Sequence, residues 1–287
     1  MDPISRRRFI KVGIGAAVAA TPPALLAYTL AIEPHWLEIV RRPLPIRGLP
    51  EALNGRTLAH LSDIHIGPQV GDEFVLESFA KVKALSPDIV VYTGDYISYR
   101  PQRGEATYAQ LREVFSQSPR GRLGTVGILG NHDYGTNWSE LPVARRVAAE
   151  IERAGVHLLS NDVANVAGLD FIGVDDLWAR RSDSRAALAL RRSDAAIALC
   201  HNPDAQDALD WADYSGWVLA GHTHGGQCKA PFLPPPLLPV RNKRYVKGEV
   251  AVDSRRTLYI NRGLGHLIQA RFNVRPEITL FTLVRNS

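Results

Sequence analysis

Five polar clusters along the chain contain the residue types that bind transition metals. In chain order they are Asp63-Ile64-His65, Gly94-Asp95, Gly130-Asn131-His132-Asp133, His201-Asn202 and Gly221-His222-Thr223-His224. Mixed imidazole and carboxylate ligands suit zinc, iron, manganese or nickel, and the lack of thiolates in the clusters argues against a closed structural zinc site. A pair of divalent ions would also need a bridging ligand, which an aspartate with two oxygens can supply.

Each cluster follows a short apolar run that predicts a buried strand. The five strands are expected over residues 58–62, 89–93, 125–129, 196–200 and 217–220. Open α/β sheets place their ligand sites at the carboxyl ends of the strands, so we expect the clusters to converge on one pocket. In Asp63-x-His65 and His222-x-His224, residues two apart on an extended chain should point the same way.

Helical and further strand segments alternate with these strands, which predicts an α/β fold. Helices are expected over residues 74–85, 108–115 and 143–154, a hairpin over 156–174 with turns at Asn161-Asp162 and Gly168, and strands over 250–253, 257–260 and 277–284. No stretch is rich enough in glycine or serine to mark a linker between two domains.

One proline-rich segment, residues 230–244, is expected to form a rigid surface loop. Its apolar residues should pack rather than be left in solvent; they are Phe232, Leu233, Leu237 and Leu238. A basic cluster lies beside them, made of Arg241, Lys243, Arg244 and Lys247. This cluster is either a solvated face or a lip that meets anionic head groups of a membrane surface.

The five clusters resemble the signature of the calcineurin-like metallophosphoesterase family, which reads D-x-H, G-D, G-N-H-[DE], H and G-H-x-H and here runs from about Leu58 to His224. The resemblance implies a four-layer αββα sandwich of two mixed β-sheets flanked by helices. It also implies two divalent metal ions, manganese, zinc or iron. One would be held by Asp63, His65 and His224, and the other by Asn131, His201 and His222, with Asp95 bridging both. His132 matches the catalytic histidine of the family.

Later motifs are similar to a narrower branch, the exported or membrane-associated phosphodiesterases of the YaeI and YkuE type. They are His224-Gly225-Gly226-Gln227, Arg244-Tyr245, the segment 259–265 and Arg275-Pro276-Glu277-Ile278. The branch is also similar to a UDP-2,3-diacylglucosamine pyrophosphatase of lipid A synthesis, which is the alternative function.

The function that we predict is metal-dependent hydrolysis of a phosphodiester or phosphomonoester. A hydroxide bridging the two ions would attack phosphorus in line with the leaving oxygen. Asn131 and the ions would stabilise the phosphoryl oxygens, and His132 would give a proton to the leaving oxygen. Asp133 would orient His132, and Arg262 would either contact a substrate phosphate or form a buried ion pair.

The N-terminus resembles a twin-arginine export signal, with Ser5-Arg6-Arg7-Arg8-Phe9-Ile10-Lys11 ahead of an apolar stretch. We expect residues 1–35 to be this signal or a membrane anchor and residues 36–287 to be the metallophosphoesterase domain. The apolar stretch 12–32 is about the ~20 residues that span a bilayer, and its cleavage stays open. The export machinery would deliver the protein to the periplasm or another extracytoplasmic site, where a lipid-linked or cell-wall phosphoester would be the substrate.

Three other functions compete with this one. The pyrophosphatase substrate is made on the cytoplasmic side, which an export signal disfavours and an inward-facing anchor would restore. A metal-free interaction module is disfavoured because no ligand of the motif is missing. A nuclease, or any nucleic-acid partner, is disfavoured because +3 of the net charge of +5 belongs to residues 1–12. Cys200 and Cys228, the two cysteines, could form at most one disulfide, although two buried thiols are favoured.

Overall fold

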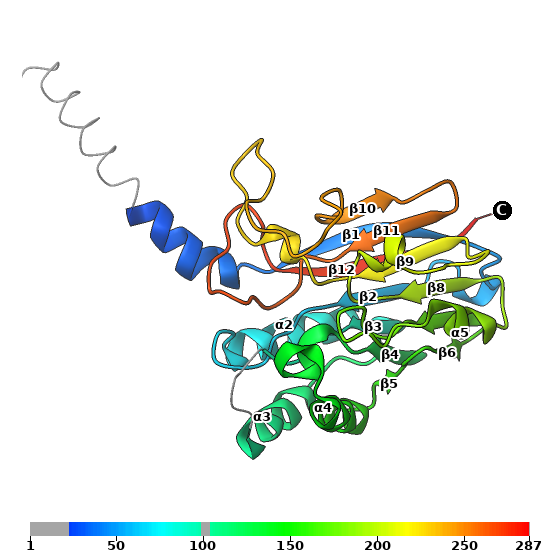
Figure 1. Cartoon of the computed structure of the whole chain (residues 1–287), viewed down its shortest axis with the longest axis horizontal. Helices are drawn as coiled ribbons and strands as arrows, with labels where there is room; N and C mark the ends of the chain where they lie inside the picture. Colours follow the sequence, from blue (N-terminus) through cyan, green and yellow to red (C-terminus); the bar gives the residue numbers. More distant parts are fainter. Residues whose placement is uncertain (1–22, 99–103, 287) are drawn as a thin grey trace, which may run out of the picture.

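The computed structural model describes residues 23–98 and 104–286. The twin-arginine segment lies outside the described residues, and so does half of the apolar stretch behind it. The described chain begins with α-helical residues 23–27, continues through η1 (Tyr28–Ile32) and η2 (Glu33–His35), and projects from the body of the protein (Figure 1). Within the two described ranges, no helix is long and apolar enough to cross a membrane.

The first of two sheets carries three of the five metal-binding clusters. Its strand order is β1-β12-β2-β3-β4-β5. The strands are β1 (Glu38–Arg47), β2 (Thr57–Leu61), β3 (Ile89–Thr93), β4 (Gly124–Ile128), β5 (His157–Leu158) and β12 (Glu277–Asn286). β12 runs antiparallel to β2, while the other neighbouring strands are parallel, so the sheet is mixed.

The second sheet carries the other two clusters, and its order is β10-β11-β9-β8-β7-β6. The strands are β6 (Asp162–Val166), β7 (Leu169–Gly173), β8 (Ala196–Leu199), β9 (Gly216–Ala220), β10 (Gly248–Ala251) and β11 (Arg256–Ile260). The central strands are parallel and both edges are antiparallel, so this sheet is mixed as well.

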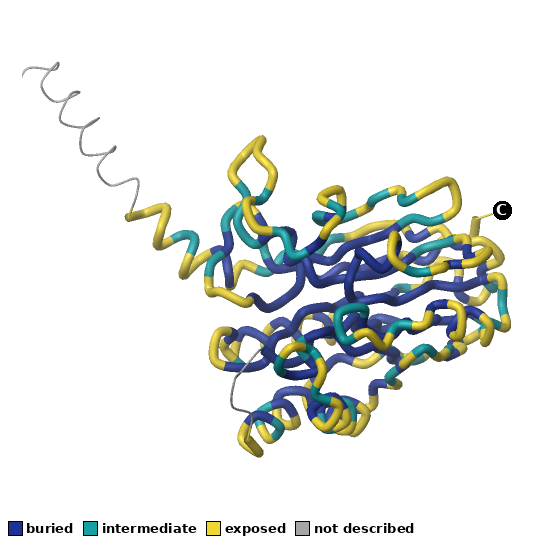
Figure 2. Tube along the Cα trace, in the orientation of Figure 1, coloured by how far each residue is buried: buried dark blue, intermediate teal, exposed yellow. Residues whose placement is uncertain are grey.

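Alternation along the strands builds the layers. In β3, Val90 and Tyr92 face a core shared with the helices α2 (Asp72–Leu85), α3 (Glu105–Phe115) and α4 (Leu141–Arg153). The alternate residues Ile89 and Val91 face a second core, which they share with residues of the other sheet such as Phe171 and Leu199. The outer face of the second sheet packs against α5 (Ser184–Ala189) and α6 (Ala205–Ala208). The central strands, such as β3 and β7, are accordingly buried along their whole length, whereas the edge strands β1 and β10 are largely exposed or half-buried (Figure 2). The expected four-layer αββα sandwich is confirmed.

The structure corrects three expectations about elements. β1, which pairs with β12 along ten residues, was not expected, because its two prolines and three arginines hide the strand pattern. The segment 156–174 contains the hairpin β6–β7, but Asn161-Asp162 is no hairpin turn, since there the chain leaves β5 in the first sheet and enters β6 in the second. The proline-rich segment 230–244 has neither helix nor strand, as expected, yet Phe232 is 102% exposed and Leu237 is 73% exposed.

Candidate metal centre

The five polar clusters meet where the two sheets pack together. The first three clusters follow β2, β3 and β4, which are parallel neighbours in one sheet. The last two follow β8 and β9, parallel neighbours in the other sheet. Because parallel strands end at the same edge, each sheet delivers its clusters to one side of the site. All seven residues predicted as metal ligands are buried there.

Asp63, His65 and His224 form the first group of converging ligand atoms. Their donor atoms all lie within 4.8 Å of one another. His65 Nε2 lies 3.1 Å from His224 Nε2, and Asp63 Oδ1 lies 3.4 Å from His224 Nε2. Three side chains from the turns after β2 and β9 therefore surround one point between the two sheets.

Asp95, His201 and His222 form the second group, again with all donor atoms within 4.8 Å. Asp95 Oδ2 lies 3.2 Å from His201 Nε2, and it also lies 3.6 Å from His65 Nε2 in the first group. This single carboxylate thus stands next to both groups, which is the position that a bridging ligand requires.

The amide of Asn131 points its oxygen into the second group. The oxygen faces only acceptors there, 3.2 Å from His201 Nε2 and 2.9 Å from His222 Nδ1, whereas the amide nitrogen lies 3.1 Å from Trp138 Nε1. Exchanging the two amide atoms would satisfy all of these contacts without a cation. With the oxygen inward and His201 deprotonated, three lone pairs converge on one point, which is the arrangement that a divalent cation would stabilise.

Most of the ligands sit on left-handed backbone rather than on extended strands. Positive φ angles occur at five of the seven predicted ligand residues, namely Asp63 (50°), His65 (54°), Asp95 (56°), His222 (71°) and His224 (49°). Such angles are uncommon for residues other than glycine and cost on the order of 1–3 kcal/mol each. The backbone is therefore not extended at these pairs, although Asp63 and His65 still reach the same group, as expected. The expectation is wrong for the other pair. His222 contributes to the second group and His224 to the first.

Two glycines make room for these turns. Gly94 has a φ of 90°, and a Cβ atom there would lie 2.4 Å from the backbone nitrogen of Gly130. A Cβ on Gly221 would lie 2.2 Å from Asp63 Oδ2. The strand exits can approach each other this closely only because these positions have no side chain.

Burial and charge set the protonation of the ligands. Burial lowers the pKa of His65 and of His222 to about 3, so both imidazoles are neutral and have a lone pair available. Burial alone would lower the pKa of His201, but the neighbouring Asp95 carboxylate raises it to about 10. Burial would likewise raise the pKa of Asp95, but His201 and His132 outweigh burial and hold it well below its usual range. A cation that enters the second group must therefore displace a proton from His201.

Hydrogen bonds to backbone carbonyl groups orient two of the imidazoles. His201 Nδ1 lies 2.7 Å from the carbonyl oxygen of Thr93, and His222 Nε2 lies 2.9 Å from that of Pro239. Donation to these carbonyls keeps the proton on the outer ring nitrogen. His222 Nδ1 therefore presents a lone pair to the centre, and His201 Nε2 does so once its proton is displaced. The neutral imidazoles, the carboxylates and the inward amide oxygen together fit a pair of divalent cations.

His132 lies beside the groups rather than within them. Its ring centroid is 5.1 Å from that of His65, and its side chain lines a cavity of about 430 Å³ together with Ser98, Asn137 and Leu267. The backbone N–H of His132 donates to Asp95 Oδ1 at 2.8 Å. This histidine is thus held at the edge of the centre and faces a space that a ligand could enter.

Asp133 interacts mainly with backbone. Its carboxylate accepts from the N–H groups of Asp95, Tyr96, Ile97 and Gly130 at 2.8–3.3 Å. These bonds tie the turn after β3 to the turn after β4. The orientation of His132 by Asp133 stays a prediction, whereas these four hydrogen bonds hold the backbone that carries Asp95.

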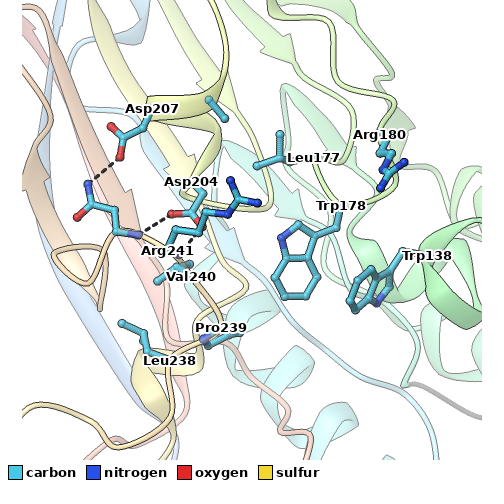
Figure 3. A pocket seen from close by; sticks show the side chains of 12 residues that line it. Trp138, Leu177, Trp178, Arg180, Asp204, Asp207, Leu238, Pro239, Val240 and Arg241 are labelled. Atoms are coloured by element: carbon cyan, nitrogen blue, oxygen red, sulfur yellow. Dashed lines mark hydrogen bonds between the residues drawn. The ribbon is translucent and has the colours of Figure 1, made fainter.

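Two tryptophans that the sequence reasoning missed stand over the second group. Trp178 meets His222 edge-on with 4.4 Å between ring centroids, and Trp138 lies 4.4 Å from Trp178. Both line a cavity of about 1020 Å³ whose wall also holds Arg180 and Arg241 (Figure 3). No motif or spacing in the sequence marks these tryptophans, because residues far apart in the chain come together only in the fold.

Other candidates have structural roles. Arg262 forms ion pairs with Glu277 and Glu38, so the ion-pair alternative holds. His60 is buried with Nε2 2.9 Å from Thr93 Oγ1, and His266 Nε2 lies 2.8 Å from the carbonyl oxygen of Gln69. Cys200 and Cys228 are both free thiols, of which only Cys200 is buried.

Comparison with known proteins agrees with this geometry. Residues 56–226 match the calcineurin-like phosphoesterase family. The chain is 34% identical to the uncharacterized metallophosphoesterase YkuE of Bacillus subtilis over 99% of both chains. It is 29% identical to the phosphodiesterase YaeI of Escherichia coli, over 98% of this chain and 100% of that protein. It is 26% identical to the UDP-2,3-diacylglucosamine pyrophosphatase LpxG of Chlamydia trachomatis, over 95% of this chain and 98% of that protein.

Proposed function

Because the chain belongs to the calcineurin-like phosphoesterase family and is a metal-dependent phosphoester hydrolase, we propose that it cleaves phosphodiesters outside the cytoplasmic membrane. The observation that carries the hydrolytic function is the pair of ligand groups joined by Asp95. A single structural metal would need one closed group, whereas two groups beside an open cavity suit an exposed reaction centre.

Two divalent cations bound in these groups would activate water as the nucleophile and neutralise charge on the phosphoryl oxygens. Manganese, zinc or iron fits the mixed imidazole and carboxylate set. Asn131 aims its amide at the second group, where it would position a substrate oxygen. His132 faces its cavity from the edge of the centre, and we assign it the transfer of a proton to the leaving oxygen.

The preference for diesters is supported by two cavities near the centre, one lined by Trp178 and one by His132, which could each take one organic group. A diester carries an organic group on both sides of phosphorus, and a monoester on one. The similarity to YaeI, which is named a phosphodiesterase, points the same way.

Export through the twin-arginine machinery is supported by the segment Ser5–Lys11 alone. Protease protection of intact and opened cells, with the native N-terminus in place, tests it. Exposure to the protease only after the outer layers are opened is expected. Protection until the cytoplasmic membrane is broken would contradict export and would favour a cytoplasmic substrate such as the one in the name of LpxG.

Metal-resolved kinetics test the hydrolytic proposal. The purified chain is stripped with a chelator, reloaded separately with manganese, zinc or iron, and assayed on bis(p-nitrophenyl) phosphate, p-nitrophenyl phosphate and a UDP-linked diacylglucosamine. We expect the diester to be the best substrate and turnover to return only with metal. A chelator-resistant activity would contradict the role of the metals, and preference for the UDP-lipid would assign the LpxG reaction instead.

A further inference from the structure

Exposed apolar side chains gather at one end of the molecule. Among the described residues, ten of the fourteen large hydrophobic residues that are exposed lie in three segments. We call these ten the apolar face; they are Leu25, Leu26, Leu30, Ile32 and Trp36, then Phe232, Leu233 and Leu237, and finally Leu267 and Ile268. Monomeric proteins rarely leave so many large apolar residues together in water, so such a face marks an interaction site.

The three segments are held to one another by hydrogen bonds and ring contacts. The backbone N–H of Arg271 donates to the carbonyl oxygen of Thr29 at 2.9 Å, and the ring of Tyr28 meets that of Phe272 with centroids 6.4 Å apart. The buried carboxylate of Glu33 accepts from the N–H groups of Asn273 and Val274. The N-terminal helix is therefore docked on the segment that carries Leu267 and Ile268.

That segment is in turn tied to the base of the proline-rich loop. The backbone N–H of Lys229 donates to the carbonyl oxygen of Phe272 at 2.8 Å, and Gln227 Nε2 donates to that of Ile268 at 2.9 Å. Pro235 packs so closely on Gly226 that a Cβ there would lie 2.2 Å from Pro235 Cβ. The three segments that carry the apolar face are thus linked to one another, and the loop projects from them (Figures 1 and 2).

The proline-rich loop and the residues that flank it carry basic charge. Residues 223–248 contain no aspartate or glutamate, and they contain five basic residues, Lys229, Arg241, Lys243, Arg244 and Lys247. At the helix, the guanidinium of Arg275 lies 4.2 Å above the ring of Trp36, which is 50% exposed. Tryptophan paired with arginine is common where protein meets the head groups of a bilayer, and basic residues add attraction to anionic lipid.

We propose that the apolar face docks on an anionic lipid bilayer, with Phe232 and Leu237 inserted among the lipids. A projecting tip with a fully exposed phenylalanine suits insertion into a soft phase better than a flat contact with a second protein. The chain ahead of the described helix continues with apolar residues 12–20 and with Arg6, Arg7, Arg8 and Lys11, which fit the same partner. This inference does not depend on the proposed hydrolysis.

Docking would place the reaction centre close to the lipid surface. The proline-rich loop bears Phe232 and Leu237, and its next residues, Leu238 and Pro239, line the large cavity beside Trp178 (Figure 3). The carbonyl of Pro239 also holds His222. A phosphoester with an apolar tail could therefore reach the centre while the tail stays in the bilayer.

Site-directed fluorescence on the full-length chain tests the proposal. Phe232→Cys, in a Cys228→Ser background, receives a polarity-sensitive label, which the full exposure of this residue allows without disturbing the fold. With vesicles of phosphatidylcholine and phosphatidylglycerol in equal amounts, we expect quenching by aqueous iodide to fall by about fivefold or more, because the label enters the acyl region. Leu190→Cys is the matched control, since Leu190 is 49% exposed after α5, far from the face, and should be quenched equally with and without vesicles.

Four results would overturn the proposal. The chain could fail to sediment with the vesicles, or it could sediment with the label at position 232 still fully accessible, which would assign binding to the N-terminus alone. Protection without vesicles that grows with protein concentration would show that a second copy covers the face. Equal protection by vesicles of phosphatidylcholine alone would contradict the requirement for anionic lipid.

Discussion

At the scale of single residues, Asp95 has the most demanding position, because it stands beside both ligand groups. It lies 3.2 Å from His201 Nε2 and 3.6 Å from His65 Nε2, and no lysine or arginine within the described ranges forms an ion pair with it. Its negative charge is therefore balanced by histidines alone when no cation is bound.

Asp95→Asn is expected to lose most of the bound metal, because the neutral amide cannot bridge two cations. Turnover of bis(p-nitrophenyl) phosphate should fall by at least about 100-fold, with metal per chain measured by elemental analysis. Asp194→Asn, an exposed site outside the centre, is the matched control and should keep both. Full metal content and full activity in Asp95→Asn would show that the site is assigned wrongly.

His132→Ala separates catalysis from metal binding. His132 belongs to neither ligand group, so the variant should keep its metal, while kcat should fall by about 10²–10⁴ through loss of proton transfer. A substrate with a very good leaving group should be affected less, because its oxygen needs no proton. Loss of metal together with activity, or the same loss of rate for every leaving group, would contradict the assigned role.

At the scale of the elements, the turns after the strands place the ligand side chains where a regular strand could not place them. Left-handed backbone directs the ligand side chains into the centre at five residues, Asp63, His65, Asp95, His222 and His224. The amino-acid sequence around these residues does not predict this backbone conformation. The sequence predicted which residues meet, because polar clusters after apolar runs are visible as a pattern. It could not predict how they meet, since φ depends on contacts between both sheets.

Gly94→Ala should disturb both folding and the centre. The added Cβ would lie 2.4 Å from the backbone nitrogen of Gly130, and Gly94 has a φ of 90°, which alanine rarely adopts. Neither backbone segment can move away easily, because each leads directly into a turn that carries ligands. We expect unfolding free energy to fall by about 2 kcal/mol or more, with weaker metal binding, in urea denaturation and metal titration. Gly104→Ala is the control, because a Cβ there meets nothing within 4 Å; equal effects of the two substitutions would contradict this account.

The helices α3 and α4 are joined by an ion pair whose contribution depends on pH. Glu150 accepts from Arg112 at 2.8 and 2.9 Å, and this hydrogen bonding lowers the pKa of Glu150 to about 2. A carboxyl whose pKa is depressed by folding stabilises the protein above its unfolded pKa and loses this effect as pH falls.

Glu150→Gln should therefore lower the unfolding free energy by about 1 kcal/mol at neutral pH, a modest value because the arginines are exposed. The difference from the unchanged protein should stay constant down to about pH 4.5 and shrink toward about pH 2. Glu152→Gln, exposed on the same helix, serves as control and should show no such difference. A difference in unfolding free energy that grows as pH falls would contradict the stabilising role of the ion pair.

At the scale of the whole molecule, the order of strands and clusters predicted an α/β fold with its ligands at one edge. The resemblance of the clusters to the metallophosphoesterase signature added the four-layer sandwich. β1 was missed because Pro43 and Pro45 and its arginines lie on an edge strand, which needs neither a full hydrogen-bond ladder nor apolar alternation. The exposure of Phe232 was missed because apolar residues were expected to find a partner within the chain. In the proposed docking, Phe232 contacts the lipid bilayer instead of another part of the chain.

The claim on which the account depends is that two cations bind between the sheets. Crystals grown with manganese, with diffraction recorded at an energy where manganese scatters anomalously, test it most directly. We expect two anomalous peaks about 3.5–4 Å apart. One should touch Asp63, His65 and His224, the other Asn131, His201 and His222, and Asp95 should touch both. A single peak that leaves one group empty, or no peak between the sheets, would contradict the account.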